Sequence, residues 1–239
     1  MIIYNIEGNS LIKIRYDGTT ISLYFENRLG CIVVAGPHQE VENDYYINCN
    51  SNINLALGKL DEVINSKKIK FYENSSTSIA DVLASFESGE YYVTHINSSD
   101  FIKYQLQSNG ECELICGTPL KQETIVVCTK SANDLDRKKV NALKEAILNG
   151  ATPNVYLYSK QYRGQELYGY YFIVEGNHLL QAYEELNMEP LLLAFVNHQP
   201  LKDDYDEIDP NVINIITSFE DIKNTSYKYF YKSLWLNRE

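Results

Sequence analysis

The sequence has no long hydrophobic segment. Its longest uninterrupted run of aliphatic or aromatic residues covers only residues 191–196, whereas a membrane-spanning helix needs roughly 18 such residues in a row. The first residues, Met-Ile-Ile-Tyr-Asn-Ile-Glu, also lack the basic flank and apolar core of a secretory signal. We therefore expect a cytoplasmic protein that has no membrane partner.

Cysteine is scarce and odd in number. Of the five cysteines, Cys112 and Cys116 form a C-x3-C pair with no histidine close to them in the sequence. This spacing fits neither a disulfide framework nor the usual zinc sites. The cysteines are expected to be reduced residues of the core or of strands, and no metal site is predicted.

Basic residues are outnumbered, with 21 Lys and Arg against 32 Asp and Glu and a net charge of −11 at pH 7. Affinity for nucleic acids comes mostly from basic side chains that displace counterions from phosphates. Nucleic acid is therefore not the expected partner, and the charge favours a basic protein partner. The alternative is that the acidic surface only keeps the protein in solution.

The 239 residues, 44% of them hydrophobic, are enough for one large domain or two smaller ones. Glycine and proline at residues 117–119 separate two strand-like segments and predict a boundary there. The expected domains are residues 1–118, of unknown role, and residues 119–239.

The first part is predicted to be a mixed α/β domain that starts with a β-hairpin. Apolar and polar residues alternate over residues 11–16 and 21–25, on both sides of the turn dipeptide Asp17-Gly18. Further strands are predicted at residues 31–35, 45–48, 69–72 and 91–96, and helices at residues 55–64 and 78–89.

The second part predicts the order β-α-β-β-α-β, so the fold class is α+β. Strands are expected at residues 124–128, 154–158, 170–174 and 191–196, with one helix ending at Gly150 and another starting after Gly176. Residues 227–236 alternate like a C-terminal aromatic strand, which would cover a sheet edge or offer that edge to another protein.

The sequence Glu175-Gly176-Asn177-His178 joins a predicted strand to a predicted helix. The unpaired N–H groups of such a helix start, together with the helix dipole, attract a phosphate or carboxylate. Gly176 leaves room for that anion and His178 can donate to it. In the alternative interpretation, Asn177 caps the helix, Gly176 permits the bend and His178 faces water.

The run from Tyr171 to Leu186, YFIVEGNHLLQAYEEL, resembles the signature of the ParB/sulfiredoxin-like superfamily, roughly D-G-H-H-R/K-x-x-A after a strand. The similarity extends over residues 119–198, including the predicted helix, glycine and proline before the central strands. The resemblance implies a ParB/sulfiredoxin-like domain that binds ATP or CTP with Mg²⁺ at this turn. Members include CTP-hydrolysing partition proteins, ATP-dependent sulfinate reductases and a free-serine kinase.

Position by position, Glu175 matches the acid of the motif, Gly176 its glycine and His178 its second histidine. Asn177 replaces a histidine, or the reactive cysteine of sulfiredoxins. Leu179 replaces the arginine or lysine that pairs with phosphate oxygens. Losing that charge-assisted contact weakens nucleotide affinity on the order of ten- to a hundredfold.

Two other cations, Arg163 and Lys144, are candidates to replace the missing one. Glu145 lies where the resemblance places an acid that abstracts a proton in kinase-like members, although we favour the alternative that it is a solvated helix glutamate. The candidate catalytic residues are Glu145, Glu175 and His178, and the candidate nucleotide-binding residues are Gly176, Asn177, His178 and Arg163.

Two functions remain open. The first is a bacterial cytoplasmic binding protein on a degenerate scaffold, for example an immunity protein that neutralises a basic toxin. The second is an ATP- or CTP-dependent phosphotransferase or nucleotide hydrolase. An acidic run at residues 203–209 would either face a basic partner or hold a divalent cation, or form a solvated loop, which we favour because the run lacks the glycine of a calcium loop.

Overall fold

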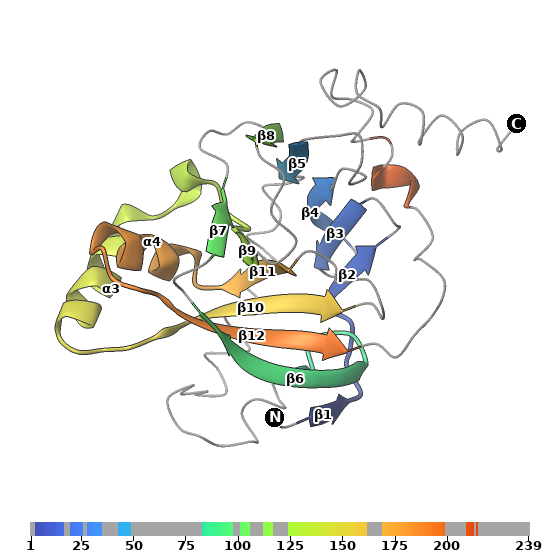
Figure 1. The fold of residues 1–239 in the computed structure, drawn as a ribbon, viewed down its shortest axis with the longest axis horizontal. Helices are drawn as coiled ribbons and strands as arrows, with labels where there is room; N and C mark the ends of the chain where they lie inside the picture. Colours follow the sequence, from blue (N-terminus) through green and yellow to red (C-terminus); the bar gives the residue numbers. More distant parts are fainter. Residues whose placement is uncertain are drawn as a thin grey trace, which may run out of the picture.

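The chain has a mixed α+β fold in which sheet predominates over helix (Figure 1). Two β-sheets and two α-helices make up most of the described structure. The computed structural model describes residues 3–16, 20–25, 28–34, 43–48, 83–97, 101–105, 112–116, 124–161, 169–198, 209–212 and 214.

The larger sheet has seven strands in the order β1-β6-β12-β10-β11-β9-β7. Strands β7, β9 and β11 run parallel to one another, as do β10 and β12, whereas β10 and β11 form an antiparallel pair. The strands are β1 (Ile3–Ile6), β6 (Gly89–Ile96), β7 (Phe101–Tyr104), β9 (Thr124–Val127), β10 (Asn154–Gln161), β11 (Gly169–Glu175) and β12 (Leu191–His198).

The smaller sheet has five strands in the order β2-β3-β4-β5-β8, and every neighbouring pair is antiparallel. The predicted hairpin is confirmed, because Ile12 pairs with Phe25 and Tyr16 pairs with Ile21. The strands are β2 (Ile12–Tyr16), β3 (Thr20–Phe25), β4 (Arg28–Val34), β5 (Asn43–Asn48) and β8 (Cys112–Cys116).

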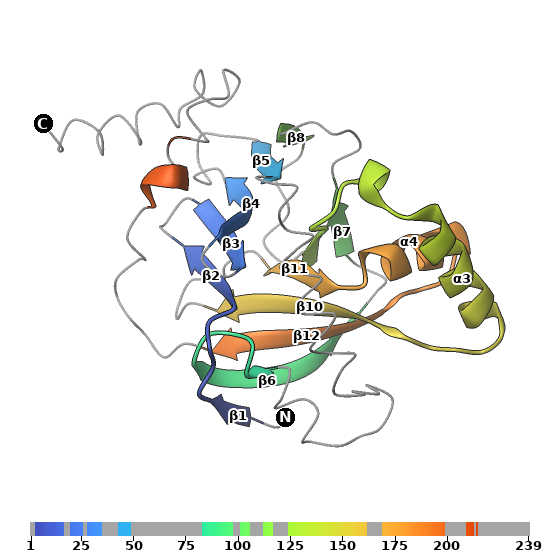
Figure 2. The same cartoon turned by 180° about the vertical axis from the view of Figure 1, so that it is seen from behind.

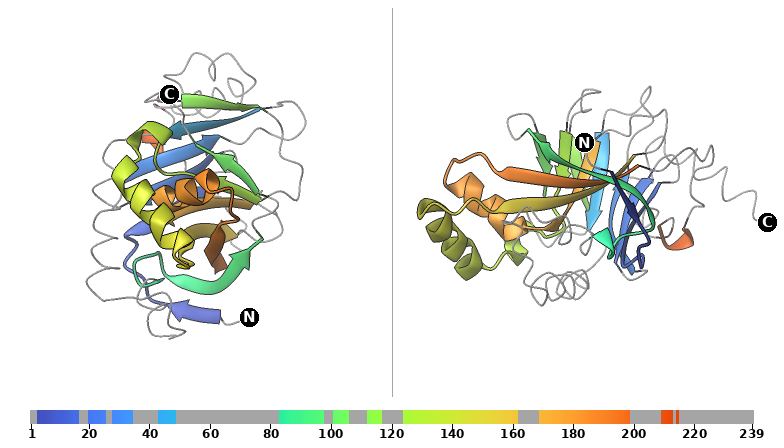
Figure 3. Two further views of the ribbon diagram at one scale, coloured as in Figure 1. Left: turned by 90° about the vertical axis from the view of Figure 1, so that its left-hand side faces the viewer. Right: turned by 90° about the horizontal axis from the view of Figure 1, so that it is seen from below.

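The seven-stranded sheet is the middle layer of three. Helices α3 (Arg137–Leu148) and α4 (Asn177–Glu185) lie on one side and strands β2 to β4 on the other, as Figures 1 and 2 show, and the left view of Figure 3 places both helices in front of the strands. Alternation along β10 explains the layering: Val155 and Leu157 belong to the helix-side core, and Tyr156 and Tyr158 to the core between the sheets.

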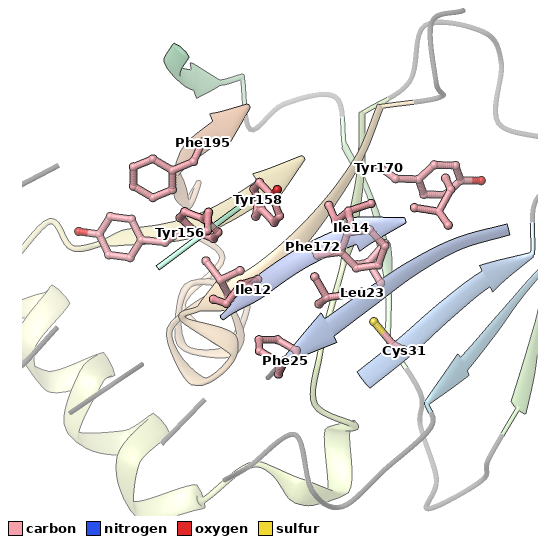
Figure 4. Close-up of a cluster of buried hydrophobic side chains, with 14 of the residues drawn as sticks. Ile12, Ile14, Leu23, Phe25, Cys31, Tyr156, Tyr158, Tyr170, Phe172 and Phe195 are labelled. Atoms are coloured by element: carbon pink, nitrogen blue, oxygen red, sulfur yellow. The ribbon is translucent and has the colours of Figure 1, made fainter. Parts of the chain in front are cut away.

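The core between the sheets is rich in aromatic side chains (Figure 4). Phe86 stacks on Tyr158 with their ring centroids 4.4 Å apart. Each fully buried side chain of this size stabilises the fold by about 1.5–3 kcal/mol before the entropy of ordering is counted. The labelled members are Ile12, Ile14, Leu23, Phe25, Cys31, Tyr156, Tyr158, Tyr170, Phe172 and Phe195.

The predicted order β-α-β-β-α-β of the second part is confirmed as β9-α3-β10-β11-α4-β12. Of the predicted helix over residues 78–89, Leu83 is helical, but the described residues that follow it are not. After Leu83 the chain turns, Phe86 forms a β-bridge with Ile12, and Gly89 begins β6. Long-range pairing with residues 9–12 overrides the local helical pattern here.

The two sheets do not divide the chain near residue 118. Strands β1, β6 and β7 precede that residue and still join β9 to β12 in one sheet. Their partners are distant in sequence, and such pairing leaves no local signal. The predicted boundary residues 117–119, helix 55–64, strand 69–72, acidic residues 203–208 and strand 227–236 lie outside the described residues.

Cys31 and Cys128 are buried thiols that form no disulfide, as expected for reduced core cysteines. Burial raises the pKa of the Cys128 thiol to about 12, so this thiol is protonated and unreactive at neutral pH. Within the described part of the chain, no helix is both long and apolar enough to cross a membrane.

Candidate functional site

The turn between β11 and α4 contains the motif residues predicted from the sequence. Gly176 adopts a left-handed conformation with φ 110° and ψ 19°. A Cβ atom built on it would lie 3.1 Å from the Cα of Val155 on the neighbouring strand. Both the backbone angle and this close approach favour glycine, so the prediction that Gly176 permits the bend is confirmed.

Asn177 does not cap α4. Gly176 occupies the N-cap position and no side chain caps the helix start. The Asn177 side chain is buried instead: its Oδ1 accepts a hydrogen bond from the Thr129 N–H at 3.1 Å, and its Nδ2 donates to Thr129 Oγ1 at 2.9 Å. Thr129 Oγ1 in turn donates to the carbonyl of Ile173 at 2.8 Å.

The hydrogen bonds between Asn177 and Thr129 connect the start of α4 to the loop that follows β9. Strands β9 and β11 are parallel neighbours, so their carboxyl ends meet at one edge of the sheet. Such an edge is where open α/β sheets commonly bind ligands. Both polar side-chain atoms of Asn177 are hydrogen-bonded to Thr129. This side chain, a candidate for nucleotide binding, therefore faces the protein interior.

His178 lies half-buried in the first turn of α4. Asp136, the N-cap residue of α3, is close enough to interact electrostatically with it. The pKa of Asp136 is lowered first by the hydrogen bond from the Lys138 N–H and only to a smaller extent by His178. A carboxylate near the helix start repels a phosphate, so this arrangement weakens the electrostatic attraction for an anion.

Leu179 is only 5% exposed and packs in the core between the helices and the seven-stranded sheet. The position that the motif reserves for a cation therefore carries an apolar core side chain. Placing an arginine or lysine there without other changes would bury a charge that lacks a partner.

The replacement cation Lys144 lies away from the turn. Its Nζ bonds to Glu185 Oε2 at 3.0 Å, at the far end of α4 and about 12 Å along the helix axis from its first residue, at 1.5 Å per residue. The other candidate, Arg163, lies outside the described residues. Glu145 is exposed on α3 and Glu175 is half-buried at the end of β11.

Glu185 of α4 accepts four hydrogen bonds, three of which come from α3 and join the two helices. Its carboxylate accepts from Arg137 at 2.7 and 3.1 Å, from Lys144 at 3.0 Å and from Gln181 at 3.2 Å. The bonds from Arg137 and Lys144 lower the pKa of Glu185 to about 2. Basic side chains of α3 are therefore used to hold the two helices together.

Residues around the turn that sequence reasoning missed come from neighbouring parallel strands. Gln105, which follows β7, donates from Nε2 to the carbonyl of Lys130 at 3.4 Å. Ser131 donates from Oγ to Asp134 Oδ2 at 2.9 Å. The parallel pairing of β7, β9 and β11 brings Gln105, Lys130 and Gly176 to one sheet edge, and no local sequence pattern indicates this.

A second polar cluster, also missed, is buried between the two sheets. We call Glu87, Tyr91, Tyr158, Lys160 and Asn197 the inter-sheet cluster. The Lys160 side chain is 4% exposed and its Nζ lies 3.0 Å from Glu87 Oε2. The sequence signal was a lysine that follows Tyr156 and Tyr158 at alternate positions and therefore shares their face of β10.

The hydrogen bonds of this cluster centre on Glu87. Tyr158 donates to Glu87 Oε1 at 2.8 Å, Tyr91 donates to the Glu87 carbonyl at 2.7 Å, and Asn197 Nδ2 donates to the Tyr91 hydroxyl at 3.0 Å. Burial raises the pKa values of Tyr91 and Tyr158 above their ordinary range, so both hydroxyls stay protonated as donors.

Within the described residues, no three His, Cys, Asp or Glu side chains are arranged to hold a metal ion. A nucleoside triphosphate with Mg²⁺ also fits poorly at the turn. Leu179 provides an apolar core side chain where a cation is needed, and the carboxylate of Asp136 near His178 repels phosphate. Comparisons with protein-family models, with curated proteins and with solved structures found no match.

Proposed function

We propose that this chain is a binding protein whose acidic surface contacts a basic protein partner. Its second part would be a degenerate ParB/sulfiredoxin-like scaffold, and an immunity protein that neutralises a basic toxin is one concrete form. The order β9-α3-β10-β11-α4-β12 supports the scaffold part of this proposal.

The observation that carries the proposal is that side chains at and near the motif positions make structural contacts within the protein. Leu179 packs in the core and Asn177 is hydrogen-bonded to Thr129. Lys144 is paired with Glu185 at the opposite end of α4. These side chains support the fold instead of converging on a phosphate, and phosphoryl transfer depends on such convergence.

The net charge of −11 supports a cationic partner. A field of one sign steers an oppositely charged protein into contact and raises the association rate. Because exposed charges are screened by salt, this binding should weaken as ionic strength rises.

The test is capture from a lysate of the native host with the purified chain as bait, at about 50 mM and about 500 mM salt, between which the Debye length falls severalfold. A basic protein retained only at the lower salt, and then bound by the purified chain in calorimetry, would support the proposal. Recovery of no basic protein at either salt would contradict it.

Exposed charged residues in the described part of the chain provide a matched pair of variants. Reversing Glu145 and Glu189 with Glu145→Lys and Glu189→Lys changes the net charge from −11 to −7 and should slow association. Reversing Lys138 with Lys138→Glu makes the charge −13 and should not slow it. An identical association rate for both variants would count against electrostatic steering.

The second candidate function is an ATP- or CTP-dependent phosphotransferase or hydrolase. It is favoured by the start of α4, where the N-cap residue Gly176 provides no capping side chain and the helix dipole attracts an anion. A thermal shift with ATP or CTP plus Mg²⁺ that disappears in His178→Ala would favour this function. No shift at millimolar nucleotide would remove it.

A further inference from the structure

The two sheets pack against each other mostly through apolar side chains. Ile12 and Ile14 of β2 meet the aromatic face of the seven-stranded sheet (Figure 4). Apolar contacts have little directional preference. A slip of β2 by two residues, about 6.8 Å at 3.4 Å per residue, would again turn its apolar side chains toward the same core.

Two crossing segments lie side by side where the sheets meet: residues 7–11 connect β1 to β2, and residues 84–88 lead into β6. The N–H groups of Asn9, Ser10 and Ile12 donate to the carbonyls of Ala84, Phe86 and Ser85, each at 3.0 Å. These bonds join the crossing segments to each other. They do not join either crossing to β10, in the middle of the larger sheet.

The inter-sheet cluster makes that connection. Lys160 of β10 donates from Nζ to Glu87 Oε2 at 3.0 Å and to the carbonyl of Ile14 at 3.1 Å. The N–H of Ile14 donates to Glu87 Oε1 at 3.3 Å. The ion pair between the buried Lys160 and the half-buried Glu87 therefore contacts β2, β10 and the crossing segment before β6 at the same time.

We propose that the Glu87–Lys160 ion pair determines the register in which the five-stranded sheet packs on the seven-stranded sheet. In a slipped register Glu87 loses either Ile14 or Lys160, whichever sheet it follows. A slip that separates Glu87 from Lys160 leaves the buried Lys160 charge without its partner. A slip that separates Glu87 from Ile14 leaves the N–H and carbonyl of Ile14 without theirs. Both losses are unfavourable, whereas the apolar contacts change little. The ion pair thus separates the native register from slipped ones in free energy.

The test uses Lys160→Met, Glu87→Gln and the double variant, with Lys103→Met as the matched control. Lys103 pairs with Glu184 at 2.6 Å, so the control removes an ion pair elsewhere in the structure. Backbone hydrogen exchange is measured in β2 and β3 and compared with exchange in β10 and β12 of the same molecule. Local opening of one sheet raises the first rate relative to the second.

The double variant should fold, because neither charge is then left alone, but its β2 and β3 amides should exchange about tenfold or more faster relative to those of β12. The control should keep the wild-type ratio. An unchanged ratio in the double variant, or an equal rise in both sheets, would overturn the proposal. If the two variants that carry Lys160→Met fail to fold, the ratio in Glu87→Gln decides by the same criterion.

Discussion

Replacing Gly176 by alanine tests whether the turn before α4 needs glycine for two separate reasons. The φ of 110° is a conformation that residues with a Cβ rarely adopt, and such strain costs about 1–3 kcal/mol. The new Cβ would also meet the Cα of Val155 at 3.1 Å, and relieving that contact adds about 1 kcal/mol.

Gly150 provides the matched control for this substitution. Its φ is 93°, and a Cβ there would have no atom within 4 Å. Gly150→Ala therefore carries the backbone strain without the contact. Both substitutions also restrict the unfolded chain, which offsets about 0.4–1 kcal/mol in each case and cancels in the comparison.

Urea unfolding followed by circular dichroism measures both variants. We expect Gly176→Ala to lower the free energy of unfolding by about 1 kcal/mol more than Gly150→Ala, which is a further 2–4 °C in Tm for a chain of this size. An equal or smaller loss in Gly176→Ala would refute the close approach of α4 to β10.

Three further predictions concern the same region. Asn177→Ala should lower the unfolding free energy by about 2–4 kcal/mol, measured in urea, because it removes two hydrogen bonds and leaves the buried Thr129 N–H unpaired. Leu179→Arg should destabilise the chain by about 3 kcal/mol or more and not restore nucleotide binding in calorimetry, because residue 179 faces the core. Glu185→Gln should lose about 1 kcal/mol at pH 7, and thermal unfolding should show the wild type losing this advantage as pH falls.

The direction of the Glu185 effect follows from its pKa. The folded value of about 2 lies below the usual 4.5, so the stabilisation is complete above about pH 4.5 and disappears as pH falls through 2. A difference between wild type and Glu185→Gln that persisted at pH 2 would contradict this assignment. Tight ATP binding by Leu179→Arg, or wild-type stability of Asn177→Ala, would contradict the other two predictions.

Local signals in the sequence predicted much of the fold. Alternation around Asp17-Gly18 predicted the β2–β3 hairpin, and Gly150 predicted the end of α3, whose last residue is Leu148. The pattern of Leu83 and Phe86 predicted a helix as far as Gly89, where the described chain instead bends to pair with residues 9–12. Helical spacing in a short segment is a weak preference that tertiary pairing overrides.

The candidate site was predictable only in outline. The glycine of the strand-to-helix turn could be recognised because few residue types other than glycine adopt a positive φ such as that of Gly176. The roles of Asn177 and Lys144 could not, because their partners Thr129 and Glu185 belong to elements far along the chain. Which side chains meet depends on which strands pair and how helices cross.

By itself, the sequence determined the identity and order of most strands and helices in the second part, together with the net charge, since each depends on residue type and short-range spacing. The tertiary structure decided that β1, β6 and β7 join the larger sheet, that Leu179 faces the core and that Lys160 meets Glu87 between the sheets. These features arise from contacts between residues that are far apart in the sequence. For such contacts, loop closure and burial of the whole core select the partner, and local preference does not.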